Sequence, residues 1–68
     1  MTDPVHKKVE VVGTSRESVS KAIAVAIERA SKSLHGLEWF EVGEIRGRVA
    51  NGKVDQYQVT LKIGFKLD

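Results

Sequence analysis

The final strand-length segment of the chain, residues 54–67, alternates between apolar and polar side chains. Its apolar members are Tyr57, Val59, Leu61, Ile63, Phe65 and Leu67, and its polar members are Gln56, Gln58, Thr60, Lys62 and Lys66. Successive side chains of a β-strand point to opposite faces, so this pattern predicts a strand with one buried and one solvent-facing side. It is typical of an antiparallel sheet covered on one side only.

A second long strand, from about residue 37 to residue 49, is predicted just before this segment. Asn51-Gly52 lies between the two and is a strong β-hairpin signal, because both turn positions favour positive φ. A two-residue turn makes Ala50 face Lys53, which sets the register of the whole hairpin.

That register predicts which side chains of the two strands meet. Phe40 faces Ile63 on the apolar side, whereas Trp39 faces Gly64 on the polar side. A glycine opposite the indole is expected to leave open area over or beside it.

Nearer the turn the same register would bury Glu44 and Arg46. Either a β-bulge near Gly43 or a longer turn would correct this. We expect the bulge, which brings Ile45 to the core side and places Arg46 on the face of Trp39.

The first half of the chain predicts one strand and one helix. Residues 5–12 are rich in alternating valine and predict a strand that ends at Gly13. Thr14 is the expected helix N-cap, with Glu17 completing a capping box. Gly36 is the expected helix stop, in the left-handed conformation. Apolar residues recur between them at helical spacing: Val19, Ala22, Ile23, Ala26, Ile27, Ala30 and Leu34.

The resulting order is β-α-β-β, in a single α+β domain that spans residues 1–68. If the last strand lies in the middle, the sheet is three-stranded and every pair is antiparallel. One face is then available to the helix.

The small size of the domain favours self-association. A chain of 68 residues buries a small fraction of its surface, and small scaffolds compensate with disulfides, metals or oligomerisation. There is no cysteine, and two isolated histidines do not make a metal centre. Oligomerisation is therefore the expected support.

Charge and hydropathy exclude several classes of function. The formal charge of +2 is not the dense cationic surface of a dedicated nucleic-acid binder. No apolar run reaches membrane-spanning length, and the first residues lack the hydrophobic segment of a signal peptide. We expect a soluble, cytoplasmic protein with neither a nucleic-acid nor a membrane partner.

Trp39 is the only tryptophan, and it falls on the polar face of its strand. An exposed indole serves equally as a stacking platform for a planar ligand or as a contact between subunits. Gln58, on the same face, could bond the edge of a heterocycle through its amide, although a solvated strand residue is the default. Arg46 and Lys66 could receive a phosphate or simply protect the sheet from aggregation.

Nothing in the sequence resembles a catalytic site, so the protein is not expected to be an enzyme. His6 and His35 lack a nearby Ser, Cys or carboxylate in a nucleophile pattern.

Taken together, the chain resembles the dodecins, which are small flavin-binding proteins that assemble as hollow dodecamers. The resemblance extends from about Val5 to Leu67. It is carried by His6-Lys7-Lys8-Val9, Val12-Gly13-Thr14-Ser15, Leu37-Glu38-Trp39-Phe40-Glu41-Val42, Glu44-Ile45-Arg46-Gly47, Tyr57-Gln58-Val59 and Gly64-Phe65-Lys66-Leu67.

The resemblance implies a sheet partly wrapped round one helix, in a homododecamer that stores or sequesters FMN, or alternatively riboflavin, and quenches its photochemistry. It implies flavins stacked between the tryptophans of two subunits, which fall on Trp39. The glutamine that bonds the isoalloxazine edge falls on Gln58, and a nearby arginine falls on Arg46. A second basic contact, usually arginine, falls on Lys66, which lacks the bidentate fork.

Some bacterial dodecins also bind coenzyme A. The matching positions are His6, where a relative has tyrosine, and Arg29, Ser33, Leu34 and His35. A shell that binds coenzyme A, or has only a structural role, is therefore the alternative to flavin storage. A sheet-based binder of single-stranded nucleic acid is a third reading.

Overall fold

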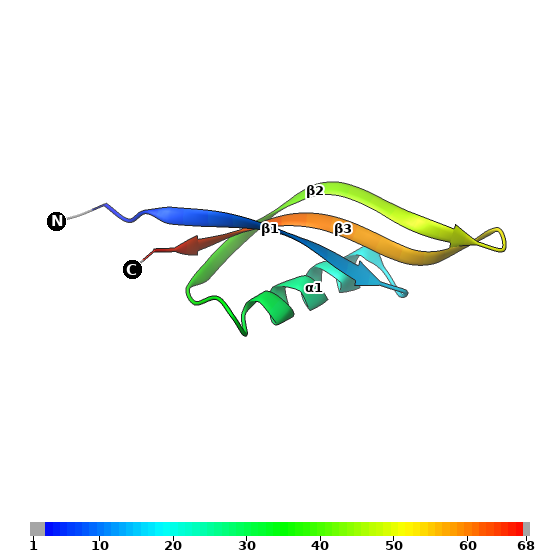
Figure 1. Cartoon of the computed structure of the whole chain (residues 1–68), viewed down its shortest axis with the longest axis horizontal. Helices are drawn as coiled ribbons and strands as arrows, with labels where there is room; N and C mark the ends of the chain where they lie inside the picture. The colour runs from blue at the N-terminus through cyan, green and yellow to red at the C-terminus, as the bar shows by residue number, and fades with distance from the viewer. Residues whose placement is uncertain (1–2, 68) are drawn as a thin grey trace.

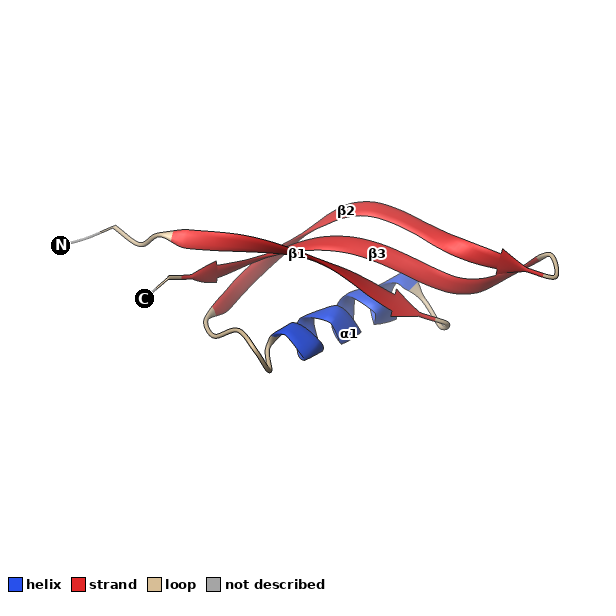
Figure 2. Cartoon of the chain, in the orientation of Figure 1, coloured by secondary structure: helices blue, strands red, loops and turns tan. Residues whose placement is uncertain are grey.

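The computed structural model describes residues 3–67, and these fold in the predicted β-α-β-β order (Figures 1 and 2). The elements are β1 (His6–Ser15), α1 (Val19–Ala30), β2 (Leu37–Ala50) and β3 (Lys53–Lys66). The sheet order is β1-β3-β2, with both pairs antiparallel. The predicted α+β class and the central position of the last strand are both confirmed.

The helix lies along one face of the sheet, beneath β1 and β3 (Figure 1). Apolar residues of β3 and two alanines of α1 form the buried core: Val59, Leu61, Ile63, Ala22 and Ala26. Gly13 permits this close packing, because a Cβ there would overlap the Ala22 carbonyl oxygen.

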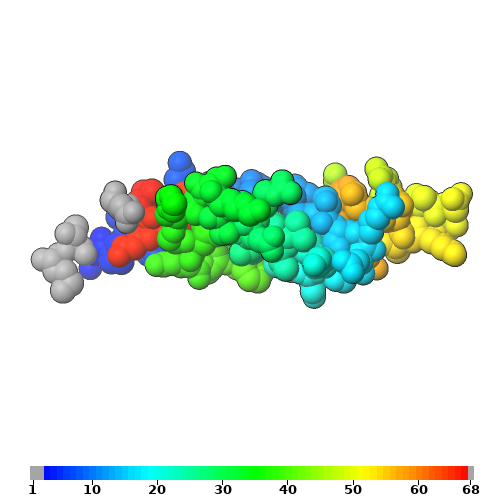
Figure 3. Space-filling model, turned by 90° about the horizontal axis from the view of Figure 1, so that it is seen from below, coloured from blue at the N-terminus to red at the C-terminus, as the bar shows by residue number. Residues whose placement is uncertain are grey.

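The helix leaves β2 uncovered. Phe40 and Val42 pair with the buried residues Ile63 and Leu61, yet they are 47% and 42% exposed. The chain measures 58 × 20 × 14 Å, and the space-filling view shows this elongated outline (Figure 3). A slab this thin has little interior, so its exposed apolar strand is available for contact with a partner surface.

The start of the helix differs from the prediction. β1 continues through Gly13 to Ser15, and Thr14 pairs with Gln58 instead of capping the helix. Ser18 is the N-cap, and its Oγ accepts a hydrogen bond from the Lys21 amide at 2.9 Å. Pairing with β3 keeps Thr14 in the sheet, so the capping role passes to a later hydroxyl.

The predicted capping box is therefore wrong as well. The Glu17 amide donates to Ser15 Oγ at 2.9 Å, in the turn before the helix.

At its C-terminal end, α1 stops at Ala30, which leaves Leu34 outside the helix. Gly36 has the expected positive φ of 72°, but it leads into β2, where its carbonyl accepts from the Lys66 amide at 3.1 Å.

The hairpin register is confirmed at both ends of the strands. Asn51 and Gly52 have φ of 53° and 72°, Ala50 pairs with Lys53, and Trp39 pairs with Gly64. The two-residue turn therefore has the backbone geometry that its sequence favours.

Two irregularities lie between those ends. A shift between Val42 and Ile45 confirms the predicted bulge near Gly43. A second shift, between Arg48 and Val49, was not predicted and leaves Asp55 of β3 without a paired residue. The two shifts are of opposite sense and cancel, so the register set by the turn is restored at Trp39.

None of the helices in residues 3–67 is long and apolar enough to cross a membrane.

Candidate functional site

Within residues 3–67, Trp39 is the single large aromatic side chain on the face of the sheet opposite the helix. Its indole lies over Gly64, because a Cβ on that glycine would overlap three carbons of the six-membered ring. Gly64 is buried beneath the ring, while Trp39 remains 38% exposed. The open area expected opposite Trp39 is thus occupied by the indole itself, which covers β3 with one side and leaves the other exposed.

Glu41 contacts the polar edge of this indole, and Lys8 in turn contacts Glu41. The Nε1–H donates to Glu41 Oε2 at 3.0 Å, and Lys8 Nζ lies 3.2 Å from the same oxygen. The indole N–H, and secondarily Lys8, hold the pKa of the Glu41 carboxyl below its ordinary value. Glu41 is therefore an ionised acceptor at neutral pH.

His6 approaches the indole from β1. The two rings are 5.2 Å apart between centroids, at an interplanar angle of 64°, which is an edge-to-face arrangement. His6 Nε2 lies 2.7 Å from Glu38 Oε1. We call Trp39, Gly64, His6 and Lys66, the residue that pairs with His6, the aromatic end of this face.

A second group of polar residues, the amide end, lies further along the same face. It consists of Gln58, Arg46 and Gln56. Arg46 Nε donates to Gln58 Oε1 at 2.9 Å, and Gln58 Nε2 donates to Gln56 Oε1 at 2.9 Å. These bonds fix the orientation of the Gln58 amide and leave it one further donor and acceptor position for a ligand.

The two ends do not meet within one chain. Gly64 and Gln58 lie on the same strand, about 20 Å apart at roughly 3.3 Å per residue. The register confirms that Trp39, Arg46 and Gln58 share a face. Arg46, however, lies beside Gln58 and far from the indole, while Lys66 belongs to the indole's end.

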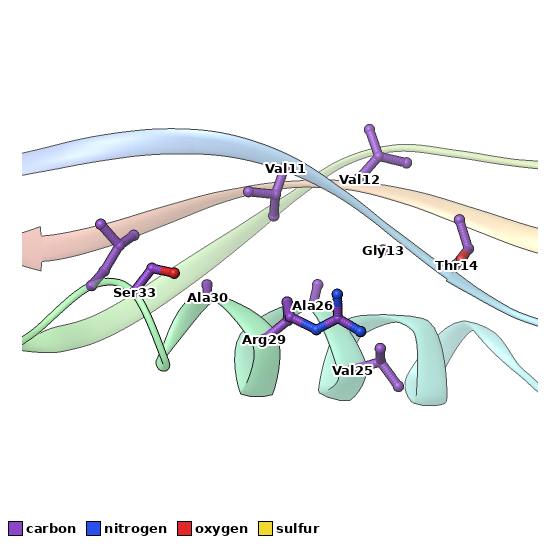
Figure 4. A pocket seen from close by; sticks show the side chains of 10 residues that line it. Val11, Val12, Gly13, Thr14, Val25, Ala26, Arg29, Ala30 and Ser33 are labelled. Atoms are coloured by element: carbon purple, nitrogen blue, oxygen red, sulfur yellow. The ribbon is translucent and has the colours of Figure 1, made fainter.

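A groove of about 410 Å³ lies on the other side of the molecule, between β1 and α1 (Figure 4). Arg29, Ser33 and Leu34, three of the predicted coenzyme A residues, line it. His6 and His35 do not: His6 is at the aromatic end, on the opposite face of β1. The structure thus gathers only part of that predicted set.

The residues that fix the indole were not predicted from the sequence. Lys8 pairs with Gly64 on one side just as Trp39 does on the other, so the three strands place Lys8 next to the indole. Glu41 is two residues from Trp39 and shares its face. The β1–β3 register was the signal that could have identified Lys8.

Residues 3–67 contain no group of three or more His, Cys, Asp or Glu side chains that could hold a metal ion. The aromatic and amide ends offer an aromatic surface, hydrogen-bonding groups and positive charge.

Comparison with known proteins identifies a consistent set of relatives. A family model described as Dodecin matches residues 5–68. A dodecin from Thermus thermophilus is 53% identical over 64 residues, which cover 94% of this chain and 93% of that protein.

Solved structures agree with this result. A dodecin from Streptomyces davaonensis has a TM-score of 0.95 at 46% identity, with 98% of each chain covered. The dodecin from Streptomyces coelicolor has a TM-score of 0.95 at 44% identity, covering 100% of this chain and 97% of that one.

Proposed function

The chain belongs to the dodecin family, and we propose that it binds flavin, preferentially FMN, in a homododecamer without turning it over. Its role is storage or sequestration of the flavin, together with quenching of the excited flavin by the stacked indole. Twelve copies of the 7.5 kDa chain amount to about 90 kDa.

The exposed indole carries this proposal. Trp39 presents one side to solvent while Gly64 supports the other. A planar heterocycle gains contact area and π-stacking on such a surface, and the site loses little entropy because the ring is already positioned. A 38% exposed tryptophan on a chain this small is otherwise unfavourable.

The separation of the two ends supports a site that is shared between subunits. An isoalloxazine that is stacked on Trp39 cannot reach Gln58 of the same chain, about 20 Å away by the strand rise. In the proposed site, the amide end of a second subunit faces the aromatic end of the first. The uncovered β2 strand, with Phe40 and Val42 exposed, supplies apolar surface for the assembly that this requires.

The charges at both ends favour FMN over riboflavin. Lys66 lies at the aromatic end, and Arg46 lies at the amide end, where its terminal guanidinium nitrogens form no hydrogen bond within residues 3–67. Either group can approach the FMN phosphate in the assembled site, Arg46 with a fork of donors and Lys66 as a point charge.

A titration of FMN with purified protein, followed by flavin fluorescence, tests the proposal. We expect quenching that saturates near one flavin per chain and is carried by a species of about 90 kDa in size-exclusion chromatography. Trp39→Ala should abolish most of the quenching. Thr60→Ala, on the same face between the two ends, is the matched control and should bind as the wild type does. Unchanged binding by Trp39→Ala would refute stacking on this indole.

Coenzyme A is the second candidate ligand, because of the groove between β1 and α1. Its walls are largely apolar, with Val11, Val25 and Ala30, and Arg29 reaches from the helix toward the gap (Figure 4). This combination suits a ligand with both an apolar arm and phosphates. Calorimetric titration with coenzyme A should give binding that weakens in Arg29→Ala and persists in Trp39→Ala. Binding unaffected by Arg29→Ala would exclude this groove.

A further inference from the structure

We propose that His6 and Glu41 are positioning residues that hold the Trp39 indole in its stacking orientation from two sides. With their hydrogen-bonding partners Glu38 and Lys8, they form what we call the indole brace. The effect on flavin affinity rests on the proposed function, whereas the effect on the indole itself can be measured without flavin.

The indole extends across the width of the sheet. Trp39 belongs to the edge strand β2, its ring covers Gly64 of the central strand β3, and it touches His6 of β1. Only a glycine at position 64 allows the ring to lie so close to the backbone, because any Cβ would overlap it. The glycine creates space for the ring but forms no bond that would hold it there.

Glu41 fixes the indole at its polar edge. The indole N–H has one hydrogen to donate, and the carboxylate accepts it at 3.0 Å. Lys8 bonds the same carboxylate from β1, with its Nζ 3.2 Å from Oε2. The acceptor is therefore tied to both edge strands, across the central one, which restricts where the N–H can point.

His6 limits rotation of the ring on the β1 side. The Glu38 carboxylate can only accept a hydrogen bond, so His6 Nε2 must carry the hydrogen of their 2.7 Å contact. This bond fixes the imidazole plane, which stands at 64° to the indole. The His6 side chain is 28% exposed, so it is partly enclosed where it meets the ring.

A braced indole binds a planar ligand more tightly than a free one. An exposed side chain that is ordered only on binding loses rotamer freedom at that moment, and pre-ordering removes this cost. Loss of one contact of the brace should therefore weaken flavin binding by roughly three- to ten-fold, the range expected for one net hydrogen bond or aromatic contact. This is a much smaller loss than removal of the indole.

Two variant pairs separate the contacts from general effects on the fold. Glu41→Leu removes the acceptor, whereas Glu41→Gln keeps an amide oxygen for the indole N–H. His6→Ala removes the ring, whereas His6→Phe keeps an aromatic edge and loses the bond to Glu38. Glu44→Leu is the control, because Glu44 is an exposed residue of the same strand that forms no hydrogen bond with Trp39.

Each variant is measured twice. Time-resolved anisotropy of the single tryptophan in flavin-free protein reports how freely the indole moves, and FMN titration gives the dissociation constant. Size-exclusion chromatography confirms that each variant assembles as the wild type does. We expect faster local depolarisation and weaker FMN binding in Glu41→Leu and His6→Ala, with partial recovery in Glu41→Gln and His6→Phe.

Wild-type indole anisotropy and FMN affinity in both Glu41→Leu and His6→Ala would overturn the proposal. Equal changes in Glu44→Leu would also overturn it, because the effect would then not come from contact with the ring. Failure of the wild type to bind FMN would refute the proposed function, and the anisotropy data would still decide whether the brace exists.

Discussion

The aromatic end and the amide end lie on one face of the same three strands, yet they are fixed by different forces. At the aromatic end, polar side chains from both edge strands contact a large apolar ring that covers a glycine. At the amide end, Arg46 and Gln56 orient a polar side chain by hydrogen bonds. The aromatic end offers area for stacking and the amide end offers directed hydrogen bonds, so the flavin site that we propose needs both.

Removal of the ring should have the largest effect. We expect Trp39→Ala to weaken FMN binding by roughly 100-fold, as for loss of a central aromatic contact. Trp39→Phe should retain part of the stacking, so its FMN affinity should lie between those of the wild type and Trp39→Ala. Fluorescence titration measures both constants. A Trp39→Ala protein that binds within about two-fold of the wild type would show that the aromatic end does not provide the stacking surface.

Filling the space beneath the ring should have the next largest effect. A methyl group in Gly64→Ala overlaps the indole, so the ring must leave its position or the backbone must shift. We expect FMN affinity to fall by at least about ten-fold, the cost of modest overpacking.

Gly43→Ala is the matched control for that substitution. A Cβ at Gly43 has its nearest neighbour at 3.4 Å, the Thr60 carbonyl oxygen, so it should fit with little adjustment. If both alanine variants bound FMN equally well, the indole would not depend on the bare backbone of Gly64.

The amide end should respond more weakly. Gln58→Leu removes the hydrogen bonds that we propose to the flavin edge but leaves the stacking surface, and we expect a loss of roughly ten-fold in FMN affinity. Trp39 anisotropy should not change, because the two ends are separate within the chain. A change in indole mobility in Gln58→Leu would mean that the ends are coupled inside one subunit.

Acid should produce the smallest effect. The pKa of Glu41 is lowered in the folded chain from its ordinary value of 4.5. Its contribution to stability is therefore present above that value and is lost as pH falls through the lower, folded pKa. The difference in melting temperature between wild type and Glu41→Gln should be larger at neutral pH and vanish in strong acid. A difference that grows on acidification would contradict the assigned bond.

Sequence patterns predicted the parts of this structure that depend on local geometry. The Asn51-Gly52 turn, the alternation of β3 and the bulge at Gly43 each follow from side chains that are close in sequence. The face of Trp39 followed from the turn by counting residues. Counting from the turn gave the correct partner for Trp39 because the register shift at Asp55, which was not predicted, is opposite to the shift at Gly43 and cancels it.

Features that depend on β1 were harder to predict. The sequence offers three plausible helix N-caps: Thr14, Ser15 and Ser18. Pairing with β3, which places Thr14 opposite Gln58, keeps the first two in β1 and leaves Ser18 as the N-cap. The brace has the same origin, since the β1–β3 register brings His6 to the indole and Lys8 to Glu41. Assigning Trp39 and Gln58 to the same face also did not give the distance between the aromatic end and the amide end along the strand.

The central claim is that one flavin site combines Trp39 of one subunit with Gln58 of another. Co-refolding a mixture of Trp39→Ala and Gln58→Leu chains tests it most directly, with FMN titration of the mixed assembly. We expect a class of high-affinity sites that is present in the mixture and absent from either variant alone, because some interfaces then pair an intact indole with an intact amide. A mixture that binds only as the sum of the separate variants would contradict a site shared between subunits.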